Sequence, residues 1–180
     1  MSGSMTERLK AQFGEAITVL ENSTVPETVT VASDSILKVA IFCKDNEAMG
    51  FDALSCLTGI DYKDRIDVVY HLLSYKLKHE LVLKVRLDRA SPRLQTVEGV
   101  WKTANWHERE CFDLLGVMFD GHPDLRRILL PDDWVGHPLR KDYVQPAEYH
   151  GISHTRIDPL GRPSPAITLR PAAGEEPRAN

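Results

Sequence analysis

The residues most capable of chemistry lie between positions 106 and 143, where charged and histidine side chains alternate with large aromatic ones. His107 and Cys111 are four residues apart, so a helix would bring two metal-binding side chains to one face, and His122 and His137 could complete a zinc site. The stretch HEREC differs from the HExxH of zinc proteases, because its fifth residue is cysteine. Because the spacing of His107 and Cys111 still allows two ligands on one helical face, a small metal hydrolase using His107, Cys111 and His122 remains an alternative.

Four charged residues of the same stretch lie on one predicted helix: Glu108, Arg109, Glu110 and Asp113. Residues two apart diverge on a helix, so Glu108 and Glu110 should face different ways. Arg109 and Asp113 are four apart and can pair, which stabilises an exposed helix by roughly a few tenths of a kcal/mol. A purely solvated face fits this stretch poorly, because its charges alternate with large aromatic side chains.

Other classes of site are excluded by missing motifs. The sequence has no GxSxG, no glycine-rich phosphate loop and no GxGxxG. The three cysteines form no CxxC pair, so thiols of this chain alone cannot hold an iron–sulfur cluster. The formal charge of −4, from 22 basic and 26 acidic residues, does not indicate a nucleic-acid partner. No run of 18 apolar residues predicts a membrane span.

The elements that must position the 106–143 residues follow from hydrophobic periodicity and turn signals. Strict alternation over 79–89 places Leu81, Leu83, Val85 and Leu87 on one buried face of a strand, with Lys84 and Arg86 on the other. The expected elements, in order, are a helix over 4–21, a strand over 29–31, a helix beginning at Ser33 or Asp34, an ambiguous stretch over 51–62, strands over 66–75 and 79–89, and a helix over 96–115 ending at Gly116.

The composition changes after the last predicted helix. Of the 11 prolines in the chain, eight lie from position 131 onward, and proline at this density forbids helices and sheet interiors. We therefore expect an α+β domain over 1–130 and an extended C-terminal docking arm over 131–180. The arm should be mobile beyond Tyr143 until a partner orders it.

The run E-R-E-x-x-D-L-L, followed after six residues by H-P-D-L-R-R-I-L, resembles the signature of one family. This family is the C-type (30 kDa-type) subunit of the proton-translocating NADH:quinone oxidoreductase, respiratory complex I. The stretches LTGIDY, VVYHLLS and LPDDWVGHPLRKDY are similar to the same family, so the resemblance covers about residues 28–143. No D-type segment follows on the sequence, which indicates the unfused form. The signature residues are Glu108, Arg109, Glu110, Asp113, Leu114, Leu115, His122, Arg126, Ile128 and Leu129.

The resemblance implies an α+β fold, with helices packed on a mixed or antiparallel sheet and an extended C-terminal arm. It also implies a chain with no catalytic residues and no cofactor of its own. FMN, iron–sulfur clusters and quinone would belong to partner subunits. The chain would pack on the D-type quinone-site subunit and on cluster-bearing subunits of the peripheral arm. It would lie peripherally on the cytoplasmic face of the bacterial inner membrane, held there only through the complex.

The signature residues receive roles from their types and positions. Glu108, Arg109, Glu110 and Asp113 would form charge-assisted bonds across the subunit interface or brace a turn, while His122, Arg126 and Arg127 would position the arm. Trp134, Leu139 and Tyr143 would anchor the arm on the D-type subunit, and Arg140 and Lys141 would meet its acidic groups. A further alternative is the equivalent subunit of a membrane-bound hydrogenase or of a ferredoxin-driven relative.

Overall fold

The computed structural model describes residues 4–19 and 26–153. The chain divides into two compact units, Met1–Tyr143 and Val144–Asn180. The predicted domain boundary at residue 130 therefore falls inside the first unit. The part of the predicted arm over 154–180 lies outside the described residues.

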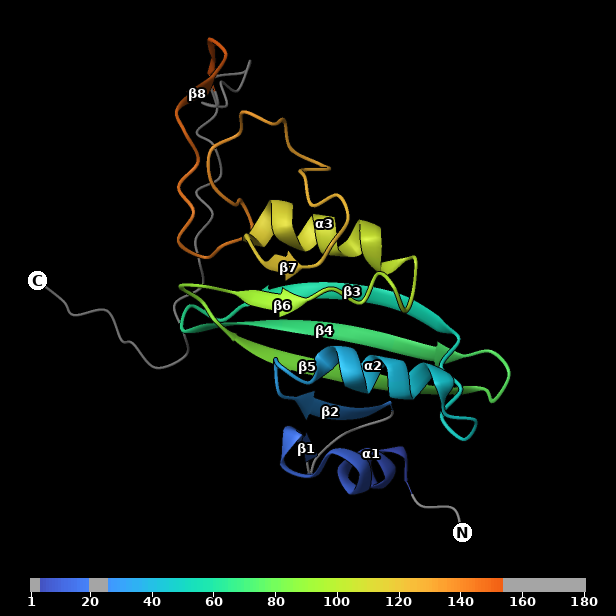
Figure 1. The fold of residues 1–180 in the computed structure, drawn as a ribbon. Helices are drawn as coiled ribbons and strands as arrows, with labels where there is room; N and C mark the ends of the chain where they lie inside the picture. The colour runs from blue at the N-terminus through green and yellow to red at the C-terminus, as the bar shows by residue number, and fades with distance from the viewer. Residues whose placement is uncertain (1–3, 20–25, 154–180) are drawn as a thin grey trace, which may run out of the picture. The chain divides into compact units, whose positions relative to one another are not determined.

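The first unit is built on a five-stranded mixed sheet with the strand order β1-β2-β5-β4-β3 (Figure 1). Neighbouring strands are antiparallel except β2 and β5, which are parallel. This arrangement, with helices packed on the sheet, confirms the predicted α+β class. The strands are β1 (Ile17–Val19), β2 (Glu27–Val31), β3 (Ala53–Asp61), β4 (Arg65–Ser74) and β5 (His79–Asp88).

The predicted β4–β5 hairpin is confirmed. Tyr70 pairs with Leu83 in the antiparallel register, and the alternating residues Leu81, Leu83, Val85 and Leu87 are all buried in the core. Arg86, from the opposite face, is exposed and Lys84 is partly exposed, as the alternation predicts. The ambiguous stretch over 51–62 forms strand β3, whose Leu54 and Leu57 join the same core.

The prediction of one helix over 4–21 is confirmed only as far as residue 13. Helix α1 covers Met5–Phe13 and ends at Gly14, which has a positive φ of 55°. After the 3-10 turn η1 (Gly14–Ala16), the β-branched residues of ITV form β1, because they pair with β2 instead of continuing the helix. Helix α2 covers Ile36–Asp45, and its predicted face of Ile36, Val39, Ala40 and Cys43 is buried.

The predicted helix over 96–115 begins later than expected. Strand β6 (Arg93–Gln95) and a turn precede helix α3, which covers Ala104–Leu115. The apolar residues that extended the helical pattern, Val97, Val100 and Trp101, are buried from within the turn. Trp101 donates its indole N–H to the carbonyl of Phe51 at 3.0 Å, which ties the turn to the segment that leads into β3.

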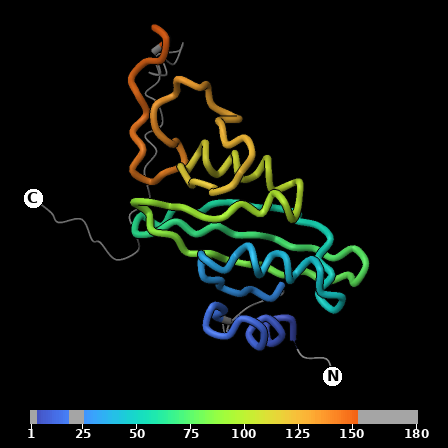
Figure 2. The backbone as a smooth tube through the Cα atoms, viewed as in Figure 1, coloured from blue at the N-terminus to red at the C-terminus, as the bar shows by residue number. Residues whose placement is uncertain are grey.

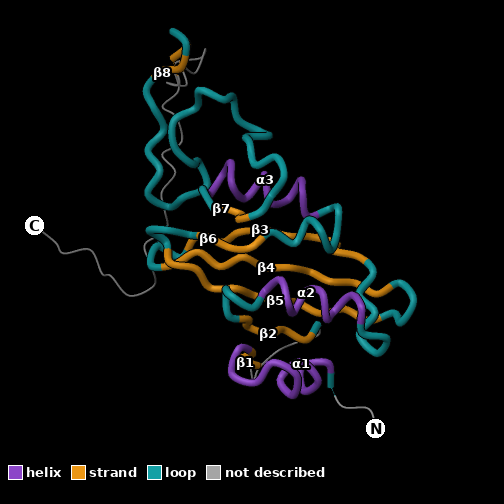
Figure 3. Tube along the Cα trace, viewed as in Figure 1, coloured by secondary structure: helices purple, strands orange, loops and turns teal. Residues whose placement is uncertain are grey.

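After α3 the chain has little regular structure. Strand β7 (Met118–Asp120) pairs in parallel with β6. The chain from there to β8 is loop (Figure 3), and its first part turns back over α3 (Figure 2). In the second unit, β8 (Glu148–Tyr149) and β9 (Ile152–Ser153) form a small antiparallel pair.

Candidate functional site

The site is a helix–loop unit, defined here as residues 104–143, in which α3 organises the loop that follows it. Gly116 ends the helix in the left-handed conformation with a φ of 73°, as the sequence predicts for a C-cap. The helix packs closely on β3, because a Cβ atom at Gly59 would lie 2.4 Å from Leu115 Cδ1. Three charged residues of α3 are buried: Glu108, Arg109 and Asp113.

Asp113 is the centre of the loop's backbone organisation. Its side chain has no exposed surface, and Oδ2 accepts hydrogen bonds from the backbone N–H groups of Ile128, Leu129 and Leu130 at 3.1, 2.8 and 2.9 Å. Oδ1 accepts a bond from Arg127 Nη1 at 2.6 Å. Burial alone would raise the pKa of Asp113, but these four donors outweigh it and lower the pKa.

Arg127 extends the same network along the loop. Its Nη2 atom donates to the carbonyl oxygens of Trp134 and Gly136, at 2.9 and 3.2 Å. One guanidinium group therefore joins Asp113 on the helix to two positions of the loop.

Arg109 also braces the loop, but through a different set of acceptors from the one predicted. Its Nε and Nη2 atoms donate to the carbonyl oxygens of Arg126 and Arg127, at 3.2 and 3.0 Å. The guanidinium carbon lies 5.3 Å from the ring centroid of Trp106, in a cation–π contact. The expected pairing of Arg109 with Asp113 is wrong, because Asp113 is taken by Arg127 and by loop N–H groups.

Glu108 is a buried carboxylate that holds the turn before α3. Its Oε1 atom accepts the backbone N–H of Val97 at 2.8 Å, and Oε2 accepts the hydroxyl of Thr96. Burial raises the pKa of Glu108 to about 7 despite these two bonds. Glu110 is exposed, so the two glutamates face different ways, as predicted.

His122 lies beside Glu108 in the turn that leaves β7. Its Nε2 atom is 3.2 Å from the carbonyl oxygen of Asn105 and 4.0 Å from Glu108 Oε2. Its Nδ1 atom accepts the backbone N–H of Asp124 at 3.0 Å. Arg126 is exposed and binds the carboxylate of Asp124 at 2.8 Å.

The stretch that follows, residues 137–140, is bonded to the C-terminal end of α3. His137 Nδ1 lies 2.9 Å from the carbonyl oxygen of Asp113, the N–H of Leu139 donates to Leu114 at 3.1 Å, and Arg140 Nε donates to Leu115 at 2.7 Å. Residues 131–143 therefore pack within the first unit instead of leaving it.

Asp61 closes the helix–loop unit, and sequence reasoning did not single it out. Its buried carboxylate binds Arg89 through Nε and Nη2, at 2.8 and 3.0 Å, and accepts the backbone N–H of Lys141 at 2.8 Å. Arg89 also binds Asp142. The hydrogen bond from Arg89 is the main reason that the pKa of Asp61 lies well below its usual range.

The protein family described as "Respiratory-chain NADH dehydrogenase, 30 Kd subunit" matches residues 29–149, which is more than half of the chain. The chain belongs to this family. The match contains the helix–loop unit and most of the sheet, and it confirms the resemblance found in the sequence. The chain is accordingly a 30 kDa-type subunit of complex I, the NADH-quinone oxidoreductase enzyme complex.

Curated relatives agree with this assignment. The chain is 45% identical over 147 residues to the C-type subunit of NADH-quinone oxidoreductase from Chloroherpeton thalassium, a match that covers 80% of this chain and 61% of that relative. It is 50% identical over 127 residues to the protein of the same name from Moorella thermoacetica, covering 69% of this chain and 84% of the relative. The chain thus spans less than two-thirds of the length of the Chloroherpeton protein.

Two solved structures share the fold. One is a trypsin-resistant fragment (1–134) of Nqo5, with 31% identity, a TM-score of 0.57, and coverage of 66% of this chain and 95% of the fragment. The other belongs to a membrane-bound sulfane sulfur reductase, an archaeal respiratory membrane complex, with a TM-score of 0.65 and coverage of 77% and 82%. At 24% identity, the second likeness shows the fold alone.

In this 30 kDa-type subunit, the helix–loop unit exposes large apolar side chains. Trp134 and Tyr143, two of the predicted anchors, are half-buried, while the third, Leu139, is exposed. The Tyr143 ring packs over Gly136, where a Cβ atom would lie 3.0 Å from Tyr143 Cε2. Sequence reasoning did not predict the exposure of Leu129 and Val135, because the bonds that hold this loop come from residues distant in the sequence. The exposed residues are Trp106 (62%), Leu129 (63%), Val135 (81%) and Leu139 (56%).

The metal-site alternative finds no support in the geometry. Within residues 4–19 and 26–153, no group of three or more His, Cys, Asp or Glu side chains is arranged to hold a metal ion. His107, Cys111 and His122 are all in this range, and they do not form such a group. His122 is instead engaged with the backbone of Asn105 and Asp124.

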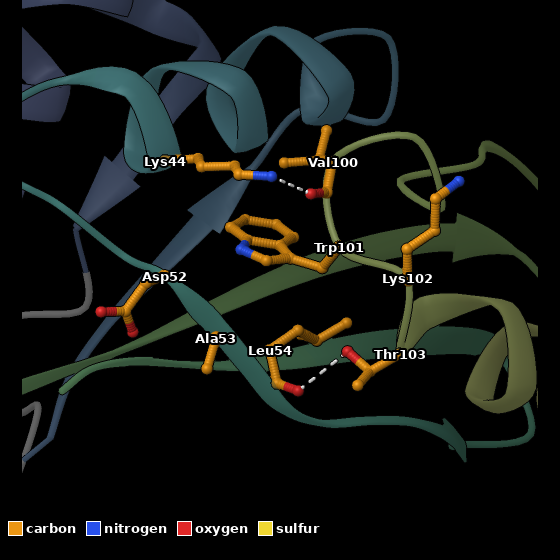
Figure 4. A pocket seen from close by; sticks show the side chains of 8 residues that line it. All are labelled: Lys44, Asp52, Ala53, Leu54, Val100, Trp101, Lys102 and Thr103. Atoms are coloured by element: carbon orange, nitrogen blue, oxygen red, sulfur yellow. Dashed lines mark hydrogen bonds between the residues drawn. The ribbon is translucent and has the colours of Figure 1, made fainter.

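A pocket of about 260 Å³ lies between the end of α2, the start of β3 and the turn before α3 (Figure 4). Its polar side chains already have partners in the chain: Lys44 Nζ donates to the carbonyl of Val100, and the Thr103 hydroxyl donates to the carbonyl of Leu54 at 3.1 Å. These bonds tie the turn before α3 to α2 and to β3, so both side chains serve to hold the fold together.

None of the helices in the described part of the chain is long and apolar enough to cross a membrane.

Proposed function

We propose that this chain is a non-catalytic subunit of the peripheral arm of NADH:quinone oxidoreductase and docks on the D-type quinone-site subunit through its helix–loop unit. Electrons would pass from NADH through FMN and iron–sulfur centres to quinone, all held by partner subunits. Cluster-bearing subunits of the arm would be further partners. The chain would be held at the cytoplasmic face of the inner membrane only through these contacts.

The observation that carries this proposal is a set of exposed apolar side chains on an internally braced loop. Asp113 fixes the backbone at Leu129, and Arg109 stacks on Trp106, yet both apolar side chains face solvent. Exposed apolar groups of this size commonly mark protein-binding surfaces. A braced loop loses little conformational entropy on binding, so the internal bonds favour recognition by a partner.

The buried charges and the exposed charges would have separate roles. Glu108, Arg109 and Asp113 brace the unit from inside, as their burial indicates. Lys141 and Arg126 are exposed at its surface, where they would meet acidic groups of the partner and contribute to orientation more than to affinity. Arg140 would contribute indirectly, because its Nε atom already binds the carbonyl of Leu115.

Co-purification with a tagged D-type subunit tests the proposal. Leu129→Asp places a charge where the interface would be apolar, and we expect recovery of the chain to fall at least about tenfold, the ratio that corresponds to 1.4 kcal/mol. Tyr75→Asp is the matched control, since Tyr75 is 72% exposed in the turn between β4 and β5. Full recovery of Leu129→Asp, or an equal loss with Tyr75→Asp, would contradict docking through the helix–loop unit.

The alternative assignment to a membrane-bound hydrogenase or a ferredoxin-driven relative differs only in the chains that deliver electrons. Purification of the intact complex from native membranes distinguishes the two, because the proposal expects an NADH-oxidising flavoprotein among the associated chains. Recovery of a hydrogenase or ferredoxin-linked input module in its place would favour the alternative.

A further inference from the structure

Glu108 is a buried carboxylate whose two hydrogen-bond donors are both neutral. They are the backbone N–H of Val97 and the hydroxyl of Thr96. Neither donor neutralises a carboxylate charge, and isolated charges are unfavourable in a protein interior. The protonation state of Glu108 therefore depends on what else faces it.

Besides His122, three titratable groups interact electrostatically with Glu108. They are the Tyr70 hydroxyl from β4, the Cys111 thiol from α3, and the Glu98 carboxylate from the turn before α3. Burial raises the pKa values of Tyr70 and Cys111, so both are uncharged at neutral pH, while Glu98 is negative and paired with Lys102. These three neighbours offer Glu108 no positive charge.

His122, in the turn over residues 121–124, lies between two acceptors. Its Nδ1 atom accepts the N–H of Asp124, so the ring hydrogen is on Nε2. Nε2 is 3.2 Å from the carbonyl oxygen of Asn105 and 4.0 Å from Glu108 Oε2. Both side chains of this pair, His122 and Glu108, are without exposed surface. A small rotation of the ring would transfer the hydrogen bond from one acceptor to the other.

We propose that Glu108 and His122 form a proton-dependent switch that sets the position of the 121–124 turn. When Glu108 takes up a proton from solvent, its attraction for His122 is lost, and the Nε2–H of His122 bonds to the carbonyl oxygen of Asn105, the nearer of the two acceptors in the structure. When Glu108 releases that proton to solvent, its negative charge attracts the same Nε2–H, and the ring turns toward the carboxylate. Because Nδ1 holds the N–H of Asp124, the backbone of the turn follows the ring.

The switch would change the surface that follows it in the chain. The turn leads within a few residues to Leu129, whose side chain is exposed on the helix–loop unit. The consequence for docking rests on the function proposed above, in which Leu129 contacts the D-type subunit. The switch itself concerns only residues of this chain.

Nuclear magnetic resonance on the full chain tests the switch between about pH 5 and pH 8. With labelled glutamate and histidine side chains, we expect Glu108 Cδ, His122 Nε2 and the amide of Asp124 to shift with one shared midpoint near neutral pH. Glu108→Gln should abolish the common shift at His122 and Asp124. Glu110→Gln is the control, because Glu110 is exposed on the same helix and should leave the shift intact.

An ordinary acidic midpoint for Glu108, or a His122 shift that persists in Glu108→Gln, would overturn the proposal. If Glu108→Gln does not fold, His122→Gln is the second test. In this variant the chemical shift of Glu108 Cδ should still change with pH, while that of the Asp124 amide should no longer change with it. Affinity for the D-type subunit, measured over the same pH range, is a separate readout. A confirmed switch with no binding at any pH would overturn the docking function and leave the switch standing. A constant affinity would overturn only its regulatory role.

Discussion

Replacing Asp113 with alanine should release the loop that carries Leu129. The substitution removes the acceptor for three backbone N–H groups, those of residues 128–130, and for Arg127 Nη1. Removing one partner of a buried ion pair costs about 3–5 kcal/mol, because the remaining groups stay buried without an acceptor. The magnitude belongs to the whole cluster, since the four bonds share one carboxylate.

Hydrogen exchange at the amides of residues 128–130 is the direct assay, because these amides are the donors. A loss of about 3 kcal/mol in local stability corresponds to exchange that is about a hundredfold faster. Urea unfolding of the same variant shows how much of the loss is global. Asp124→Ala is the control, since its carboxylate binds the exposed Arg126 and should leave these amides unchanged. Unchanged protection in Asp113→Ala would refute the brace.

Three further outcomes follow from the structure. The raised pKa of Glu108 means that the folded chain binds a proton that the unfolded chain releases. The free energy of unfolding, relative to that of Glu108→Gln, should therefore be highest below pH 4.5, the ordinary pKa of glutamate, and fall by up to about 1.4 kcal/mol per pH unit until about pH 7. Urea titrations at several pH values measure this decline. Gly59→Ala should destabilise by about 1–3 kcal/mol through the close approach of α3, whereas Gly99→Ala, with open space around it, should not. Leu83→Ala should cost about 2–5 kcal/mol in thermal or urea unfolding, and a neutral result would contradict its place in the core.

The parts of the fold that could be predicted are those controlled by local periodicity. Strand β5 shows its alternation within ten residues, and the face of α2 shows its spacing within one helix. The errors occurred where packing overrides a local pattern. Trp101 continues the spacing of a helix, but it lies in a turn and packs into the core. The segment ITV, residues 17–19, continues the pattern of α1 but pairs with β2 as a strand.

The residues of the helix–loop unit could be named from the sequence, but the bonds between them could not be derived. The spacing of Arg109 and Asp113 predicted that these two side chains pair. This was wrong, because their actual partners come from a loop 14 to 18 residues away. The bonds of Asp61 to Arg89 and Lys141 span 28 and 80 positions. No periodic pattern reports contacts at such separations, so only the folded chain reveals which charge meets which.

Hydrogen exchange of the chain alone and in complex with a D-type subunit tests the central claim most directly. Docking through the helix–loop unit predicts that protection gained on binding is concentrated in residues 104–143, around Trp106 and Leu129. Protection gained instead on the sheet face that carries Lys84 and Arg86, with 104–143 unchanged, would contradict the account.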